Sequence, residues 1–543
     1  MSKSIPVLPE TVEATDVADV ADVTDAAEAN RGADVADVAD EGVLQLPRGL
    51  RPGDRLTLDI VALDGDGLGT ARVDADVGPQ RQRKRYDVRV RHGLPGDRLD
   101  VVIARRARRR LQARTVAVVV ASPLRTEARC RHFGPLERPD RGCGGCLLQH
   151  VAPRDQHAWK SERIGSLLAA AGFEAGVLRP LRAGPQPWRY RNKMELSFGD
   201  RGDGEVGLGM HPVGYRHEVV DLHECWLIAE ASAALVAPFS ARVRELGLQV
   251  HDQVRGSGWL RNLTIRDGLR TGERSIELVT SDADPIETTD GERTAASVVE
   301  SLRETLEATA TRLDTAVTAF AWTRVAAVRG EATRMETSVV AGRATLHERL
   351  ELAGGHTLDF DIHPRAFFQP NTAGAELLYG EVLAAADLTS GAGTQWAALD
   401  LYCGTGTIAL CLAPWVASVV GVELVAEAVD NARTNAARND IDNVEFHAGD
   451  AAVVLAGLGA GAGHFDLVVV DPPRSGLMPA ALAQVIALAP ANLIYVSCNP
   501  VALVRDLQTL VEAGFTVATV TPVDHFPHTA HLECVASLRG PKL

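Results

Sequence analysis

Cys498 is the residue of this chain with the clearest capacity for chemistry. It stands in the segment YVSCNP (495–500), directly after an apolar run at 493–496 that predicts a buried strand. A thiolate is a strong nucleophile near neutral pH, and strand ends are where α/β enzymes place reacting groups. The alternative for Cys498 is an inert buried thiol. The residues that precede and follow it favour the nucleophile.

Six short apolar segments in the last third of the chain predict the strands that would position Cys498. They lie at 397–401, 418–422, 444–447, 466–470, 493–496 and 515–520, and helical patterns separate them. This alternation is typical of a doubly wound, mainly parallel sheet. We therefore predict a Rossmann-like α/β domain over residues 351–543.

The first two of these strands end in residues suited to a nucleoside. The first runs into the loop DLYCGTGT (400–407), and the second ends at Glu423. Glycines allow a tight turn against a cofactor, and an acid at the second strand end can accept both ribose hydroxyls. Gly404, Gly406 and Ala409 also satisfy the G-x-G-x-x-G/A pattern of nicotinamide enzymes. The loop alone is compatible with a dehydrogenase as well as a methyltransferase.

The third and fourth strand ends separate these two classes. Asp450 follows the third strand, where a carboxylate can meet an adenine amino group. The segment DPPR (471–474) follows the fourth strand and resembles the acidic-Pro-Pro segment of S-adenosylmethionine-dependent methyltransferases that act on nucleic acid. A dehydrogenase has no use for such a segment. The four strand ends together favour a methyltransferase.

The chemistry of a pyrimidine explains why a methyltransferase would carry Cys498. Carbon 5 of the ring is too weak a nucleophile to take a methyl group from a sulfonium, but thiolate addition to carbon 6 makes it enolate-like. A base must then remove the carbon 5 proton before the thiol can leave. Glu533, which opens the last strand, is the expected base. His528 and His531 are alternatives, and either could instead be structural.

Together the motifs resemble the RNA 5-methyluridine methyltransferase family, the uracil-C5 methylases of tRNA and ribosomal RNA. The segments that carry the resemblance are FFQ (367–369), DLYCGTG (400–406), DPPRSG (471–476), SCNP (497–500) and FPHT (526–529) with Glu533. The resemblance spans the chain from about residue 47 to its end. It implies that Cys498 attacks carbon 6 of a uridine flipped out of its RNA and that Glu533 is the base.

The same resemblance implies S-adenosylmethionine as the methyl donor. The residues expected to contact it or to order its site are Gln369, Tyr402, Gly404, Gly406, Glu423, Asp450 and Asp471. Cytosine-C5 RNA methylases place a cysteine in the motif after the fourth strand, whereas this chain has DPPR there, which favours uridine. The competing interpretations are methylation of another pyrimidine and a catalytically inactive RNA-binding iron-sulfur protein.

A second group of cysteines has the spacing of a metal site. Cys130, Cys143 and Cys146 form C-x12-C-x2-C, and Cys225 is a remote fourth thiol. Four thiolates suit a [4Fe-4S] cluster or a tetrahedral zinc, and the spacing alone does not choose between them. Unligated core thiols are the structural alternative. The family resemblance selects the iron-sulfur cluster, and a structural or RNA-orienting role fits it because methyl transfer moves no electrons.

The N-terminal part of the chain divides by charge. Residues 1–46 hold eleven acids against Lys3 and Arg31, with repeated Asp-Val-Ala, and we expect a disordered tail. Residues 81–114 hold thirteen Lys and Arg against three Asp, the balance expected of a phosphate-binding surface, although a solvated basic face would look the same. Five short predicted strands at 47–122, broken by Gly, Pro and Asp, resemble the OB-like, RNA-binding TRAM domain.

The remaining expectations concern the middle of the chain and its setting. Residues 123–350 are predicted to form a central α+β domain that carries the cysteines and an RNA-facing surface. In it the segments RYRNK (189–193) and LRN (260–262) could clamp a single-stranded loop, or could be ordinary sheet residues. The chain lacks an apolar run long enough to span a bilayer. We expect a cytoplasmic monomer whose partner is tRNA or ribosomal RNA, with no membrane association.

Overall fold

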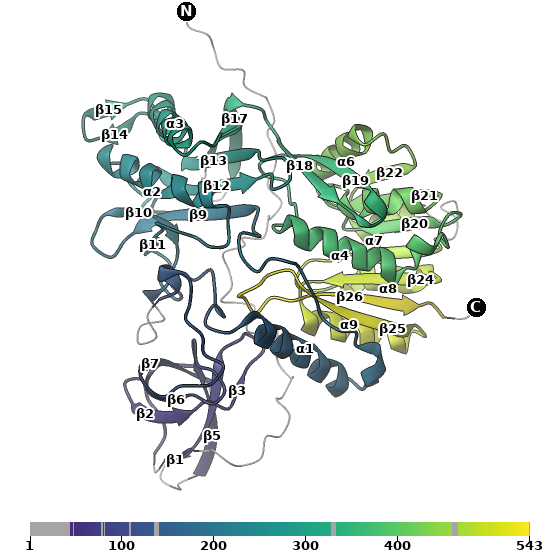
Figure 1. The fold of residues 1–543 in the computed structure, drawn as a ribbon, viewed down its shortest axis with the longest axis horizontal. Coiled ribbons are helices and arrows are strands. Elements are labelled where there is room, and N and C mark those ends of the chain that lie inside the picture. The colour runs from purple at the N-terminus through teal and green to yellow at the C-terminus, as the bar shows by residue number, and fades with distance from the viewer. Residues whose placement is uncertain are drawn as a thin grey trace, which may run out of the picture.

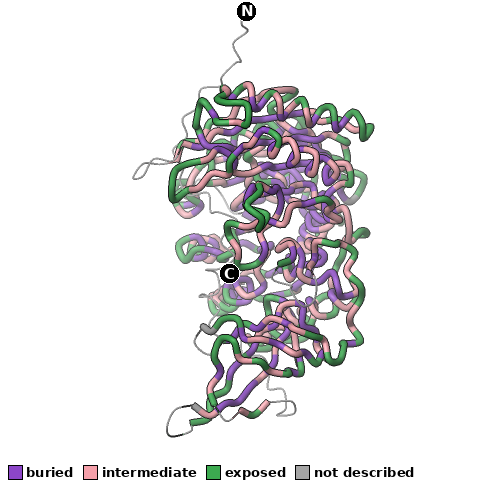
Figure 2. The backbone as a smooth tube through the Cα atoms, turned by 90° about the vertical axis from the view of Figure 1, so that its left-hand side faces the viewer, coloured by how far each residue is buried: buried purple, intermediate pink, exposed green. Residues whose placement is uncertain are grey.

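The computed structural model describes residues 44–46, 48–77, 80, 82–107, 110–134, 141–326, 333–458 and 465–541. They form an N-terminal barrel, a central body and a C-terminal α/β body (Figure 1). Buried segments run through the interior of each body (Figure 2). Most of the predicted tail (1–43), and Arg81, Arg108 and Arg109 of the basic segment, lie outside the described residues. Within the described residues, every helix is too short or too polar to cross a membrane.

The N-terminal barrel is a near-closed sheet of short strands around one apolar core. Its strands follow the order β1-β4-β5-β7-β6-β2, with β3 beside β4. Alternate residues along each strand point inward, so Val73, Tyr86, Val88 and Leu99 share the core. The five predicted strands are all present among β1 (Leu44–Leu46), β2 (Arg55–Asp59), β3 (Ala62–Leu63), β4 (Gly69–Val77), β5 (Gln82–Val90), β6 (Arg98–Ala107) and β7 (Arg110–Val120). Because β1 pairs with β4, the barrel begins three residues before the predicted boundary at 47.

The central body is a seven-stranded sheet backed by two helices. The sheet has the order β11-β10-β9-β12-β13-β16-β17. Its strands are β9 (Lys193–Asp200), β10 (Val206–Met210), β11 (Val220–Asp221), β12 (Leu260–Asp267), β13 (Arg274–Ser281), β16 (Ala319–Ala326) and β17 (Arg334–Gly342), and a hairpin of β14 (Ile286–Thr288) and β15 (Gly291–Arg293) lies at one end. The helices α2 (Glu230–Glu245) and α3 (Ala295–Arg312) bury Leu235, Val236, Val298 and Leu302 in the same core as the sheet.

The C-terminal body confirms the predicted doubly wound sheet. Its order is β22-β21-β20-β23-β24-β26-β25-β8, and the first five strands are parallel. The strands are β20 (Ala397–Leu401), β21 (Ser418–Glu423), β22 (Val444–Ala448), β23 (Leu467–Val470), β24 (Asn492–Ser497), β25 (Thr516–Asp524) and β26 (Glu533–Arg539). The last strand, β26, runs antiparallel to both β24 and β25, between which it is inserted.

Helices connect these strands and cover the sheet. They are α4 (Thr372–Ala385), α5 (Thr407–Leu412), α6 (Ala426–Arg438), α7 (Ala451–Leu458), α8 (Pro479–Leu488) and α9 (Pro500–Glu512). Their apolar faces and the sheet form two cores, one on each side of the sheet. Every crossover between parallel strands therefore returns the chain to the same edge, where the predicted site residues follow the carboxyl ends of the strands.

The boundary predicted between the central and C-terminal domains at 350/351 is wrong, because elements from before it belong to the C-terminal body. The hairpin of β18 (Leu346–Glu351) and β19 (Thr357–Ile362) spans that boundary and packs into the C-terminal core. The helix α1 (Pro153–Ala170; Figure 1) buries Ile164 and Leu168 in the core on one side of the sheet, and β8 (Arg182–Ala183) extends the sheet by pairing with β25. Long-range packing, which local pattern does not reveal, decides where these segments belong.

Candidate active site

Cys498 stands in a braced turn between β24 and α9. Asn499 caps α9 by accepting a hydrogen bond from the Val501 N–H (3.2 Å), and its side-chain amide donates to the Arg474 carbonyl (2.9 Å). The Ser497 hydroxyl accepts from the Asn499 N–H at 3.1 Å. Cys498 itself is half-buried. The turn therefore holds the thiol rigidly and ties it to the DPPR loop.

The register of β24 and β26 brings Cys498 and Glu533 to neighbouring positions. Ser497 is paired with Cys534, so the next residue on β24, Cys498, is level with Glu533 at the start of β26. The Glu533 side chain is only 3% exposed. The structure therefore brings these two predicted residues together at one edge of the sheet, and their roles stay a prediction.

The carboxyl groups near Cys498 have raised pKa values. Burial raises the pKa of Glu533 to about 8, and the nearby Asp471 charge adds to the rise. Burial also raises the pKa of Asp471 to about 7. Burial raises the pKa of Cys498 to about 12, and the charges of Glu533 and Asp471 add to the rise. The charge of Arg474 lowers it in part. A cation placed among these groups would favour the ionised form of all three.

The DPPR loop is held against β24 by a carboxylate that sequence reasoning missed. Asp506, on α9, accepts hydrogen bonds from the Tyr495 hydroxyl (2.6 Å) and from the Leu477 N–H (2.9 Å). Arg505 bonds the same carboxylate at 2.7 Å and the Ser475 carbonyl at 2.8 Å. A signal existed in the sequence, because Asp506 interrupts the apolar stripe of α9 and is buried there.

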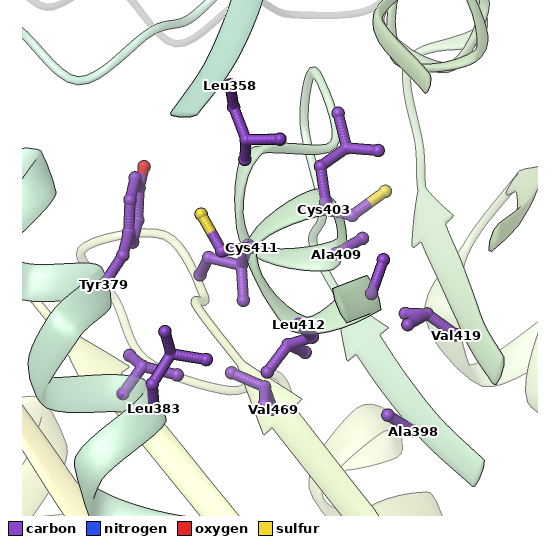
Figure 3. Close-up of a cluster of buried hydrophobic side chains, with 14 of the residues drawn as sticks. Leu358, Tyr379, Leu383, Ala398, Cys403, Ala409, Cys411, Leu412, Val419 and Val469 are labelled. Atoms are coloured by element: carbon purple, nitrogen blue, oxygen red, sulfur yellow. The ribbon is translucent and has the colours of Figure 1, made fainter. Parts of the chain in front are cut away.

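The loop after β20 has the backbone of a ligand cradle. Tyr402, Gly404 and Gly406 adopt positive φ angles of 67°, 54° and 81°. A Cβ on Gly406 would lie 2.9 Å from the Phe446 ring, whereas a Cβ on Gly404 would meet nothing within 4 Å. The first glycine therefore faces open space and the second lets the loop pack closely. The two cysteines nearest this loop, Cys403 and Cys411, lie in the apolar core beneath it (Figure 3).

Acids from the neighbouring strand ends surround this loop. One oxygen of Glu423 accepts the Gly404 N–H (3.1 Å) and the other accepts the Val425 N–H (2.9 Å), which leaves further lone pairs free to meet a ligand. Asp450 caps the start of α7 through the Ala452 N–H at 3.0 Å. Glu423, Asp450 and Tyr402 are close enough that both carboxylates raise the pKa of the Tyr402 hydroxyl, after burial.

Gln369 belongs to a loop that the central body holds in place. Asn192 donates from its side chain to the Gln369 carbonyl (2.9 Å) and from its backbone to the Pro370 carbonyl (2.8 Å). The buried Arg266 bonds the Ala366 carbonyl at 2.9 Å. Phe367, in the same loop, is 68% exposed. The loop is thus fixed from behind while Phe367 faces solvent.

The predicted RNA clamp at 189–193 is wrong for two of its residues. Tyr190 and Asn192 are buried, and the Tyr190 hydroxyl donates to the Pro527 carbonyl at 3.1 Å. Arg189 bonds the carbonyls of Cys225 and Ile228. Tyr190 therefore links the central body to the C-terminal body, and this role depends on Pro527, which is far away in sequence. The segment 260–262 is half-buried at Arg261 and Asn262, and its role stays a prediction.

Of the two histidines considered as bases, His528 is structural. It is 1% exposed, its ring stacks on Trp188 with 3.8 Å between ring centres, and its Nδ1 lies 3.1 Å from Nε2 of Gln156. Burial lowers the pKa of His528 to about 4. His531 is exposed and lies edge-on to Phe526. These observations argue against His528 as the base and leave His531 as the alternative to Glu533.

The four cysteines predicted to bind a metal are near enough to one another for their charges to interact. Burial raises the pKa of Cys143 to about 12, and the charges of Cys225 and Cys130 contribute. Burial raises the pKa of Cys146 as well, and the charges of Cys143, Cys225 and Cys130 add to the rise. The Gly145 N–H lies 3.4 Å from the Cys143 sulfur. Within the described residues, no three His, Cys, Asp or Glu side chains have the spacing of a metal site.

Comparison with known proteins places this arrangement in context. Residues 300–540 match the family model described as tRNA (Uracil-5-)-methyltransferase. An uncharacterized RNA methyltransferase of Protochlamydia amoebophila is 34% identical over 82% of this chain and 99% of its own length. One from Halalkalibacterium halodurans is 32% identical over 89% of this chain and 97% of its own length.

A solved structure is similar in fold. It is that of Pyrococcus abyssi tRNA (uracil-54, C5)-methyltransferase in complex with S-adenosyl-L-homocysteine, with a TM-score of 0.64 and 24% identity. The similarity covers 89% of this chain and 99% of that one. The three-body architecture is therefore shared along almost the full length of both proteins.

The buried acid at 533 predicts a measurable dependence of stability on pH. The pKa of Glu533 is raised in the folded chain, so its protonated form favours folding and this contribution is lost as pH rises through about 8. Glu533→Gln removes the titration. We expect the melting temperature of the variant, relative to the unsubstituted chain, to increase between pH 5 and pH 9.

Calorimetry or circular dichroism at several pH values measures this difference. Glu162→Gln, which changes an exposed glutamate on α1, is the matched control and should show no such trend. A difference in melting temperature for Glu533→Gln that is constant with pH would show that Glu533 does not titrate in this window.

Proposed function

Because this chain belongs to the RNA (uracil-5-)-methyltransferase family, we propose that it transfers a methyl group from S-adenosylmethionine to carbon 5 of a uridine in tRNA or ribosomal RNA. The observation that carries the proposal is the register that sets Cys498 level with Glu533, beside the DPPR loop. A nucleophile and a base on adjacent strands can act on two neighbouring atoms of one ring. Carbons 6 and 5 of uracil are such a pair.

The residues after β20, β21 and β22 fit the methyl donor. S-adenosylmethionine, when bound, supplies an electrophilic methyl group on a sulfonium cation. The open space in front of Gly404 would admit the cofactor, and Glu423 retains lone pairs for ribose hydroxyls. Asp450 lies close by for the adenine. Asp471, Tyr402 and Gln369 would complete the cradle.

The mechanism assigns one task to each reacting residue. The Cys498 thiolate adds to carbon 6 of a uridine flipped into the site, and the electron pair moves to carbon 5, which takes the methyl group. The Glu533 carboxylate then removes the proton from carbon 5, and the thiolate leaves carbon 6 as the ring double bond returns. A positive charge next to Asp471 would offset the burial that raises the pKa of Cys498 and Glu533.

The N-terminal barrel supports RNA as the substrate. Exposed basic residues project from its strands, among them Arg83 and Lys84 on β5 and Arg105 on β6. Cationic side chains on a small barrel suit the phosphates of a folded RNA. We infer that this barrel is a TRAM domain. Mapping 5-methyluridine in tRNA and ribosomal RNA, from cells with and without the gene, identifies which RNA is the substrate.

Replacing the nucleophile should stop the reaction at its first step. In Cys498→Ala, we expect methyl transfer to fall by at least about a thousandfold, because no covalent bond to carbon 6 can form. The variant should also fail to form a covalent complex with RNA that contains 5-fluorouridine. Cys411→Ala, which changes a thiol buried in the C-terminal core, is the matched control and should retain trapping. Full activity in Cys498→Ala would overturn the mechanism.

Replacing the base should stop the reaction after methyl transfer. In Glu533→Gln, the methylated adduct cannot lose its carbon 5 proton, so the cysteine cannot leave. We expect the RNA to stay attached to the protein on a denaturing gel, with the methyl group already incorporated. If Glu533→Gln released methylated RNA at the rate of the unsubstituted enzyme, another group would have to be the base.

For the cysteine group we propose a [4Fe-4S] cluster held by Cys130, Cys143, Cys146 and Cys225. The four thiols lie within electrostatic reach of one another, and an N–H directed at the Cys143 sulfur suits a cluster ligand. Burial raises the pKa of Cys130 to about 11 and that of Cys143 to about 12, so these thiols need a metal centre to become thiolates. A cluster there would be structural.

Anaerobic purification followed by an absorbance spectrum tests this proposal. We expect a broad band near the violet that is lost in Cys143→Ser, with about four irons per chain by elemental analysis. Cys411→Ser, which changes a cysteine in the C-terminal core, should keep the band. Zinc in place of iron, or a protein without metal, would contradict the assignment.

A further inference from the structure

Glu533 follows directly after the short connection 525–532 between β25 and β26. Since Glu533 is the first residue of β26, the conformation of this connection fixes where its carboxylate lies. The His525 N–H bonds the Val523 carbonyl of β25 at 3.0 Å, and Tyr190 and Asn371 bond the Pro527 and His525 carbonyls. Further partners come from α1 and from the turn that follows Cys146, both more than 350 residues earlier in the chain.

His528 lies near the middle of the connection, and hydrogen bonds hold both its backbone N–H and its carbonyl. Its φ angle of 66° lies in the left-handed region, which a residue other than glycine adopts at a cost. Its carbonyl accepts the N–H groups of both Leu147 and Leu148, each at 2.9 Å. Its own N–H donates to Oε1 of Gln156 at 2.9 Å. The surrounding contacts therefore impose this conformation.

Gln156 joins the two segments that meet at His528. It is 2% exposed, and its amide nitrogen donates to the carbonyls of Leu148 (3.0 Å) and Val151 (2.8 Å) and lies 3.1 Å from Nδ1 of His528. All polar atoms of this side chain are engaged, each with the turn after Cys146 or with His528. The site requires a side chain that both donates and accepts hydrogen bonds, as glutamine does.

Lys160 holds the start of the same connection, one helical turn after Gln156. Its ammonium bonds Oδ1 of Asp524 at 2.6 Å and the Phe526 carbonyl at 3.1 Å, and both side chains of the ion pair are buried. His157 approaches the other oxygen of Asp524 at 3.0 Å. A buried ion pair contributes little net stability but fixes geometry, because each charge requires its partner at one place.

Arg163 completes the row by bonding the Ala530 carbonyl, at the end of the connection, at 3.0 Å. The spacing of Gln156, Lys160 and Arg163 places them on one face of α1. We propose that this face of α1 positions the base, with Gln156 and Lys160 as positioning residues for Glu533. The inference rests on the proposed function. It adds to that function that Gln156 and Lys160 support one step, the removal of the carbon 5 proton by Glu533.

The nucleophile depends on separate supports. Cys498 is braced by Ser497 and by the contact of Asn499 with Arg474, and Asp506 fastens the DPPR loop. None of these hydrogen bonds involves Gln156 or Lys160. Loosening the α1 face should therefore leave attack on carbon 6 and methyl transfer largely intact and slow removal of the carbon 5 proton.

Gln156→Ala and Lys160→Met test this expectation, with Ser166→Ala, an exposed position on α1, as the matched control. We expect turnover to fall about tenfold to hundredfold in both variants, because small displacements of a catalytic group cost rate on this scale. The KM for S-adenosylmethionine should not change. The fraction of enzyme that carries methylated RNA covalently during turnover should rise, and Ser166→Ala should match the unsubstituted enzyme.

Lys160→Met leaves Asp524 buried without its cation, so Lys160→Met/Asp524→Asn provides a form with neither charge. It should show the same rise in adduct. Two results would overturn the proposal. One is a fraction of covalent adduct that falls in proportion to turnover in folded variants, and the other is turnover equal to that of the unsubstituted enzyme. Failure of the proposed function would look different, because the unsubstituted enzyme would then neither make 5-methyluridine nor form an adduct in its Glu533→Gln form.

Discussion

The antiparallel pairing of β26 between β24 and β25 is the constraint on which the rest of the site depends. A purely parallel sheet would end with β24 and offer Cys498 no neighbour at its own level. The inserted strand begins at Glu533 and is paired through Ser497 and Cys534, so a carboxylate and a thiol share one edge. The other motif residues follow the carboxyl ends of the parallel strands at the same edge. The chemistry is thus a consequence of strand register.

This arrangement has an electrostatic cost. Asp400, Asp471 and Glu533 are all acids at the carboxyl edge, and burial raises the pKa of each. Asp400 uses one oxygen to accept the Ala409 N–H at 2.8 Å, which fixes the start of α5. Carboxyls that resist ionisation favour a cationic ligand, since a positive charge relieves their mutual repulsion. The same acids that destabilise the free protein at alkaline pH would then contribute to binding a sulfonium.

Sequence patterns predicted the strands of the C-terminal sheet well, but they did not reveal the residues that hold the candidate site in place. The parallel strands were predicted to within a residue or two, because each is a short apolar run between turn residues. Sequence reasoning missed Asp506, Asn192 and Lys160. Each of them bonds residues that are distant in sequence and come close only in the folded chain. Tyr190 was misassigned for the same reason. An aromatic residue among arginines has the composition of an RNA contact, and its burial against Pro527 is invisible in local sequence.

The barrel and the base are joined by a continuous line of contacts. His92, at the end of β5, stacks on Phe133 with 4.1 Å between ring centres, and its carbonyl accepts from Arg125 at 2.6 Å. Arg91 donates to the Cys146 carbonyl at 3.2 Å, and the two residues after Cys146 bond His528. These contacts fix the distance between the basic strands and Glu533. The turn after Cys146 is the element through which the barrel and the connection before Glu533 are joined.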